Sequence, residues 1–129
     1  MTPPSVLLDA TFLAAVVAPE HDAASEVAEA YLQLLDDYEA HRVRLRARRD
    51  HLTAVAPELR RTLLSPVQGI SVAHQYRRAA QRLVTPVEMT EDERITLVVM
   101  RRERIDRIGT LAPAFAAFDV RIHPAPAAI

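Results

Sequence analysis

The carboxylates that could do chemistry stand at two places where an element begins or ends. Asp9 follows the short apolar run Val6-Leu7-Leu8, and Glu91-Asp92-Glu93 follows Thr90 at the start of a strongly helical segment. Carboxylates that converge from separate elements bind Mg²⁺ or Mn²⁺, since these hard cations prefer oxygen ligands and retain water for attack on a substrate. Both groups also have a purely structural interpretation, in which Asp9 caps the next helix and the acidic trio complements a helix dipole.

A second chemical pattern is the alternating run Arg42, Arg44, Arg46 and Arg48. Strict alternation of polar and apolar residues predicts a strand with these guanidinium groups on one face. Such a row can follow the phosphates of RNA, and Arg44, Arg46 and Arg48 are the predicted RNA-binding residues. The alternatives are an edge strand protected from aggregation by charge, or a strand that faces an acidic helix.

The composition excludes several kinds of site. The absence of cysteine excludes disulfide frameworks, thiol nucleophiles and Cys-ligated metals. The only two glycines form no phosphate-binding loop, and the five histidines have no metal-ligand spacing and are interpreted as structural. The longest apolar run, 12–18, is far too short for a membrane span. We therefore expect one soluble cytoplasmic domain over 1–129, with a frayed Ala/Pro tail at 124–129.

Charge is distributed unevenly along the chain, although the formal net charge is only -1. Residues 1–41 carry eight acids and no arginine, a net of -8, whereas 42–82 carry ten arginines and two acids, a net of +8. Two interpretations stay open: solvated faces that neutralise each other, or a basic surface for a polyanion beside an acidic site.

The elements that must position these residues alternate between strands and helices. Strands are predicted at 6–8, 42–48, 70–73, 105–110 and 120–122, with a turn at Pro66 and Gly69. Helices are predicted at 11–18, at 22–38 with Asp22 as its N-cap, at 49–65 divided by Pro57, at 75–84, and at 91–104 capped by Thr90. This order predicts an α/β fold, a three-layer α/β/α sandwich around a mostly parallel sheet. Ligands of such sheets gather at the carboxyl ends of the strands, where Asp9 lies.

The same residues resemble a known family. The segment 6–15 (VLLDATFLAA) is similar to the opening strand and turn of PIN-domain ribonucleases, especially VapC-type toxins. The segment 93–115 resembles their later helix, Gly-containing strand and following turn, and 120–124 resembles their closing strand. The resemblance implies a PIN-like fold and a Mg²⁺- or Mn²⁺-dependent endoribonuclease. It further implies a toxin that pairs with an antitoxin protein and forms a homodimer.

The resemblance also assigns site residues. Asp9 occupies the first acidic position, and Glu93 stands where the family has an Asp, with Asp92 as the alternative if the register slips. Asp50 is the nearest acid to a third position, and Ala112 replaces the fourth acid. Asp9 and Glu93 are thus the predicted catalytic and metal-binding residues, joined in the metal set by Asp92 and Asp50 as further candidates.

An incomplete acidic set predicts weak metal binding, because Mg²⁺ demands near-ideal octahedral geometry. The leading hypothesis is a VapC-like endoribonuclease whose activity is weakened or lost through a degenerate site. The alternative is a catalytically inactive PIN-like module that binds RNA or a protein. A coincidental likeness of an unrelated α/β domain is a third possibility.

Overall fold

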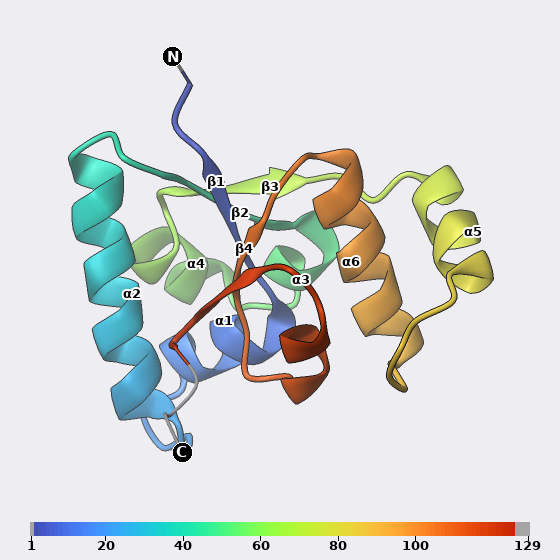
Figure 1. Ribbon diagram of the computed structural model, residues 1–129. Helices are drawn as coiled ribbons and strands as arrows, with labels where there is room; N and C mark the ends of the chain where they lie inside the picture. The colour runs from blue at the N-terminus through green and yellow to red at the C-terminus, as the bar shows by residue number, and fades with distance from the viewer. Residues whose placement is uncertain (1, 126–129) are drawn as a thin grey trace.

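The computed structural model describes residues 2–125 of the chain, in which strands and helices alternate (Figure 1). The strands are β1 (Ser5–Leu8), β2 (Arg44–Arg48), β3 (Val67–Ile70), β4 (Arg107–Gly109) and β5 (Arg121–His123). The helices are α1 (Ala10–Val17), α2 (Ala24–Glu39), α3 (Arg49–Thr53), α4 (Pro57–Leu63), α5 (His74–Arg82), α6 (Glu91–Arg102) and the 3₁₀ helix η1 (Pro113–Ala117).

The five strands form one parallel sheet in the order β3-β2-β1-β4-β5. β1 is central and pairs with both β2 and β4. Because every strand runs in the same direction, the segments that follow β1 and β2 emerge at the same edge of the sheet.

Helices cover both faces of the sheet and enclose two separate cores. Val6 and Leu8 of β1 pack with α1 and α2, whereas Leu7 points to the other face and packs with residues of α5, α6 and η1. Successive strand residues point to opposite faces, so a strand that is apolar throughout is buried on both sides. The predicted three-layer α/β/α sandwich is confirmed.

Two helix starts test the predicted caps. Thr90 forms a capping box, in which its Oγ1 accepts from Glu93 N at 3.1 Å and its own N donates to Glu93 Oε1 at 2.9 Å, as expected for the start of α6. The prediction that Asp22 caps α2 is wrong, since the helix begins at Ala24 and its N-cap, Ala23, makes no side-chain cap bond.

The sheet corrects the predictions for β2 and β3. β2 is Arg44–Arg48 rather than 42–48, and it lies between β1 and β3, so it is no edge strand. Its Leu45 and Ala47 pack on the side of α2, which turns Arg44, Arg46 and Arg48 away from that acidic helix. β3 is 67–70 rather than 70–73, and Gly69 pairs with Ala47 inside the strand instead of forming the turn.

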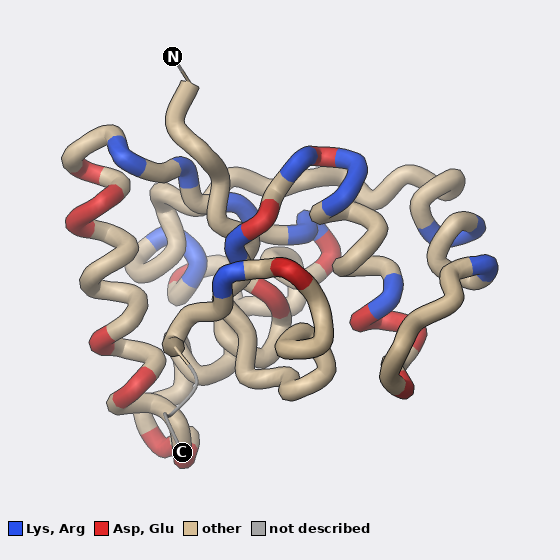
Figure 2. The backbone as a smooth tube through the Cα atoms, viewed as in Figure 1, with Lys and Arg blue, Asp and Glu red and all other residues tan. Residues whose placement is uncertain are grey.

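The charge asymmetry follows individual elements (Figure 2). Acidic positions run along α2, whereas arginines mark β2, α4, α5 and the turn after α6. Among the residues that the structure describes, one ion pair links an acid of α2 to an arginine, between Asp37 Oδ1 and Nη1 of Arg42, which precedes β2, at 3.2 Å. In the described part of the chain, every helix is too short or too polar to cross a membrane. Residues 126–129 of the predicted tail lie outside the described residues.

Candidate functional site

Asp9 stands at the carboxyl end of the central strand, where its side chain caps α1. Its Oδ1 accepts hydrogen bonds from Phe12 N at 3.0 Å and from Thr11 Oγ1 at 2.6 Å, and its Oδ2 accepts from Thr110 Oγ1 at 2.5 Å. The residue is only 5% exposed. Burial raises the pKa of the Asp9 carboxyl above its ordinary value, and the three hydrogen bonds partly offset that rise. Asp9 therefore has the capping role that the sequence allowed, at the sheet edge where ligands bind.

The loop after β4 contacts Asp9 through Thr110 but brings no further acid. Ala112 N donates to Thr110 Oγ1 at 3.0 Å, and Leu111 N donates to Thr11 Oγ1 at 2.9 Å. Ala112 is the N-cap residue of η1 and lines a hollow of about 330 Å³ beside Thr110. The position predicted to lack its acid thus lies next to the hydrogen-bond network of Asp9.

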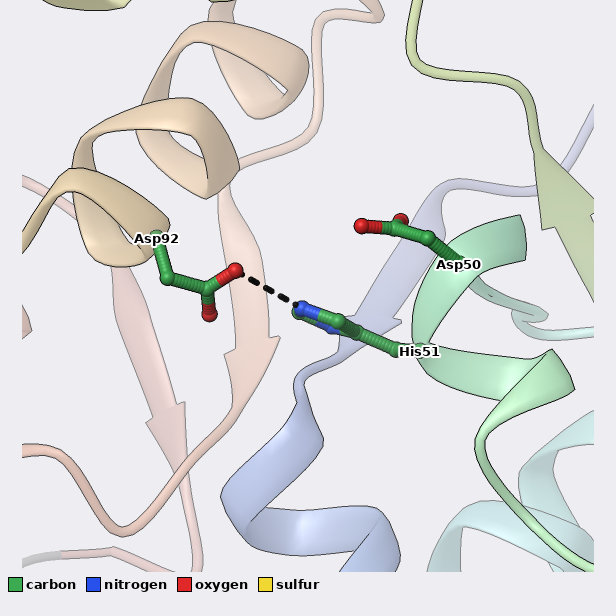
Figure 3. A group of neighbouring side chains, drawn as sticks. All are labelled: Asp50, His51 and Asp92. Carbon is green, nitrogen blue, oxygen red and sulfur yellow. Dashed lines mark hydrogen bonds and ion pairs between the residues drawn. The ribbon is translucent and has the colours of Figure 1, made fainter.

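Three further side chains meet where β2 ends and α6 begins. Asp50 and His51 of α3 and Asp92 of α6 offer ligand atoms that all lie within 4.8 Å of one another (Figure 3). His51 is 8% exposed, its Nε2 lies 3.2 Å from Asp92 Oδ1, and its charge also lowers the pKa of Asp9. Its buried Nδ1 has no hydrogen-bond partner among the described residues. We call Asp50, His51 and Asp92 the acidic cluster.

Arg48 joins the two carboxylates of this cluster. Its Nε donates to Asp50 Oδ1 at 3.0 Å and its Nη2 to Asp50 Oδ2 at 2.5 Å. Its Nη1 lies 2.9 Å from Asp92 Oδ1 and also donates to Asp92 O and to Thr96 Oγ1. The Arg48 side chain is 1% exposed, whereas Asp50 and Asp92 face solvent. Burial alone raises the pKa of the Asp50 carboxyl, but the hydrogen bonds and charge of Arg48 bring that pKa below its ordinary value.

Two of the three acids in the first turn of α6 make different contacts. Glu93 is the third residue of the helix and its carboxylate is held by the backbone of Thr90 in the capping box. Asp92, one position earlier, points toward α3 and joins the acidic cluster. The structure thus brings Asp92 together with Asp50, two of the four predicted metal ligands, and places Glu93 in the cap.

The predicted RNA-binding arginines differ in exposure. Arg44 and Arg46 are half-buried on the sheet face opposite Leu45 and Ala47, and each has a buried Nε without a hydrogen-bond partner among the described residues. Arg48 is buried, because the start of α6 covers it. Its guanidinium donates hydrogen bonds to Asp50, Asp92 and Thr96.

Comparisons with known proteins bear on the fold. No model of a protein family matches the chain, and no curated protein sequence does. Among solved structures, the crystal structure of VapC20 from Mycobacterium tuberculosis, described as a sarcin–ricin loop cleaving toxin, matches with a TM-score of 0.65. The match covers 90% of this chain and 98% of that one.

The fold is PIN-like. At 15% sequence identity this likeness establishes the PIN-like fold alone. What the chain does with the fold must follow from the chemistry of its own residues.

Sequence reasoning missed two members of the site. His51 was grouped with four scattered histidines, although its place directly after Asp50, just past the predicted strand 42–48, is a signal for the same sheet edge. The pairing of Arg48 with Asp92 had no local signal, because the two residues are 44 positions apart.

The donor set suits a divalent cation only in part. The acidic cluster offers two carboxylates and an imidazole, but both carboxylates contact the guanidinium of Arg48. Ala112 offers no ligand, and the carboxylate of Glu93 is held in the cap. As folded, these residues do not fit a tightly held Mg²⁺, and we derive no metal-bound step.

Proposed function

We propose that this chain acts on RNA as a VapC-like endoribonuclease whose activity is weakened by an incomplete acidic set. One observation carries the proposal. In a PIN-like fold, Asp50 of α3 and Asp92 of α6 meet beside His51, and Asp9 stands at the carboxyl end of the central strand, where the charge of His51 lowers the pKa of its carboxyl. Converging carboxylates at this edge are the usual setting for phosphodiester chemistry that is assisted by a cation.

The chain's own residues supply part of what cleavage of an RNA phosphodiester needs. Asp50 and Asp92 are exposed and can meet a substrate, whereas Asp9 is buried and orients the turn between β1 and α1. Arg44 and Arg46 follow one face of β2 toward the acidic cluster, and we propose that they neutralise RNA phosphates. Asp50 and Asp92 would hold Mg²⁺ or Mn²⁺ only weakly, because the ligand set is incomplete and both carboxylates contact Arg48.

The partners and assembly follow from the same proposal. A VapC-like toxin is expected to pair with an antitoxin protein, to form a homodimer and to work in the cytoplasm. VapC20 is described as cleaving the sarcin–ricin loop, so an RNA of that sequence is a sensible first substrate for this chain.

A catalytically inactive PIN-like module that binds RNA or a protein is the second candidate. Two features favour it. Ala112 leaves the site one acid short, and the ion pairs of Arg48 neutralise Asp50 and Asp92. Both candidates predict RNA binding that weakens with salt, and they differ in cleavage.

The test is an RNA cleavage assay with a sarcin–ricin loop oligonucleotide and unrelated stem-loops, each in Mg²⁺, Mn²⁺ or EDTA. We expect slow cleavage in a divalent ion that EDTA stops and that Asp92→Asn reduces at least ten-fold. Glu91→Gln is the matched control, since Glu91 is an exposed acid of the same helical turn outside the cluster. RNA binding without cleavage would select the inactive module, and the absence of both would overturn the proposal.

A further inference from the structure

We propose that Arg48 is the built-in cation of the acidic cluster, held where a divalent ion would otherwise bridge Asp50 and Asp92. The inference goes beyond the proposed function and does not depend on it, because it concerns the charge balance of the folded chain. It rests on the contacts of one fully buried guanidinium.

The contacts of Arg48 are those of a bridging cation. The guanidinium takes both oxygens of Asp50 in a fork-to-fork arrangement and, with Nη1, reaches Asp92 Oδ1 from the opposite side. Such bidentate pairs are the strong form of the arginine–carboxylate interaction. Thr96 Oγ1 and Asp92 O accept further bonds from Nη1, so all three nitrogens are engaged.

The charges balance without a metal ion. Asp50 and Asp92 carry two negative charges, and Arg48 supplies one positive charge between them. Arg77 of α5 supplies a second, with Nη2 3.7 Å from Asp50 Oδ2. Two carboxylates that would otherwise repel each other and favour a divalent ion are thereby neutralised by the protein itself.

The fold holds Arg48 in this place. Leu45 and Ala47 pack on the side of α2, so alternation turns Arg48 toward α6, whose first turn covers it. α3 begins at the next residue, which puts Asp50 two positions away on the same side. A buried guanidinium is strongly bound to its partners, because leaving them would strand a charge in the interior.

Competition between Arg48 and a divalent ion is the consequence that can be measured. Mn²⁺ is the probe of choice, because carboxylate oxygens suit it and the cluster offers two carboxylates beside the imidazole of His51. Removal of the guanidinium should uncover a binding site made of Asp50, His51 and Asp92.

The experiment measures Mn²⁺ binding by electron paramagnetic resonance and by thermal shift, without RNA, in wild type and in Arg48→Gln. Arg46→Gln is the matched control, since Arg46 lies on the same face of the same strand without an ion pair among the described residues. We expect Arg48→Gln to bind Mn²⁺ at least ten-fold more tightly than wild type and Arg46→Gln. Adding Asp92→Asn to Arg48→Gln should abolish the gain.

Thr96→Val serves if Arg48→Gln is too unstable to study. It removes one acceptor of the guanidinium and leaves every carboxylate in place, so a smaller gain in Mn²⁺ affinity is expected. Folded Arg48→Gln or Thr96→Val without any gain would overturn the inference. Tight binding of Mn²⁺ by the wild type that Asp92→Asn abolishes would also overturn it, because the cluster would then hold metal despite Arg48.

Discussion

Replacement of Asp9 by alanine removes the acceptor of three hydrogen bonds, and the free-energy cost differs among the three donors. The N–H of Phe12 loses its cap, which costs about 1 kcal/mol of folding free energy. The hydroxyl of Thr110 is buried and loses the acceptor for its proton, which costs about 1–2 kcal/mol. Thr11 is exposed, so its hydroxyl can turn to water at little cost.

The net loss is smaller than the sum, because the variant no longer buries a carboxylate whose desolvation raises its pKa. We expect Asp9→Ala to lower the free energy of unfolding by about 2 kcal/mol, and Tm by roughly 6–8 °C at about 3–4 °C per kcal/mol for a chain of this length. Asp9→Asn keeps an acceptor for Phe12 N and should lose about half as much.

Thermal unfolding followed by circular dichroism in EDTA is the assay, since it removes any contribution from metal. Asp22→Ala is the control, because the sequence pattern suggested a cap at both positions and the structure shows one only at Asp9. Asp22→Ala should change Tm by less than about 2 °C, the effect of an ordinary surface substitution. Equal shifts for the two alanine variants would refute the reasoning from the hydrogen-bond network.

Four further predictions follow from other parts of the molecule. Ala112→Asp places an acid beside the Asp9 network and should tighten Mn²⁺ binding measurably by titration calorimetry; unchanged binding would show that this position is too far from the cluster. Arg44→Ala and Arg46→Ala should each weaken RNA binding and lower the slope of log K against log salt by about one, whereas equal slopes would assign both residues to structure. Burial, with the charges of Arg107 and Arg121, lowers the pKa of His123 to about 4. As pH drops from 6.5 toward 4, His123 is protonated in the unfolded chain before it is in the folded one, so the free energy of unfolding falls. His123→Gln should reduce this pH dependence of the unfolding free energy, measured by urea unfolding at each pH. Light scattering at tens of micromolar should show a homodimer, and a monomer would contradict that expectation.

Local patterns in the sequence predicted the framework because their causes are local. The apolar run before Asp9 indicated a buried strand and the residue that ends it, and Thr90 with Glu93 three positions later indicated a helix start. Alternation in 42–48 indicated a strand with its arginines on one face, and the observed strand is Arg44–Arg48. Each of these signals depends on neighbours within one turn or one strand, so the sequence alone contains it.

The site needed the tertiary structure. Alternation placed Arg44, Arg46 and Arg48 on one face, but only the packing of α6 against β2 shows that Arg48 is buried and the other two are partly exposed. The same packing selects Asp92 over Glu93 for the acidic cluster, a choice that depends on the rotation of a helix about its axis. Arg48 and His51 contact Asp92 across more than 40 positions of sequence, and these contacts depend on how α6 packs against β2 and α3. Local sequence patterns contain no information on that packing.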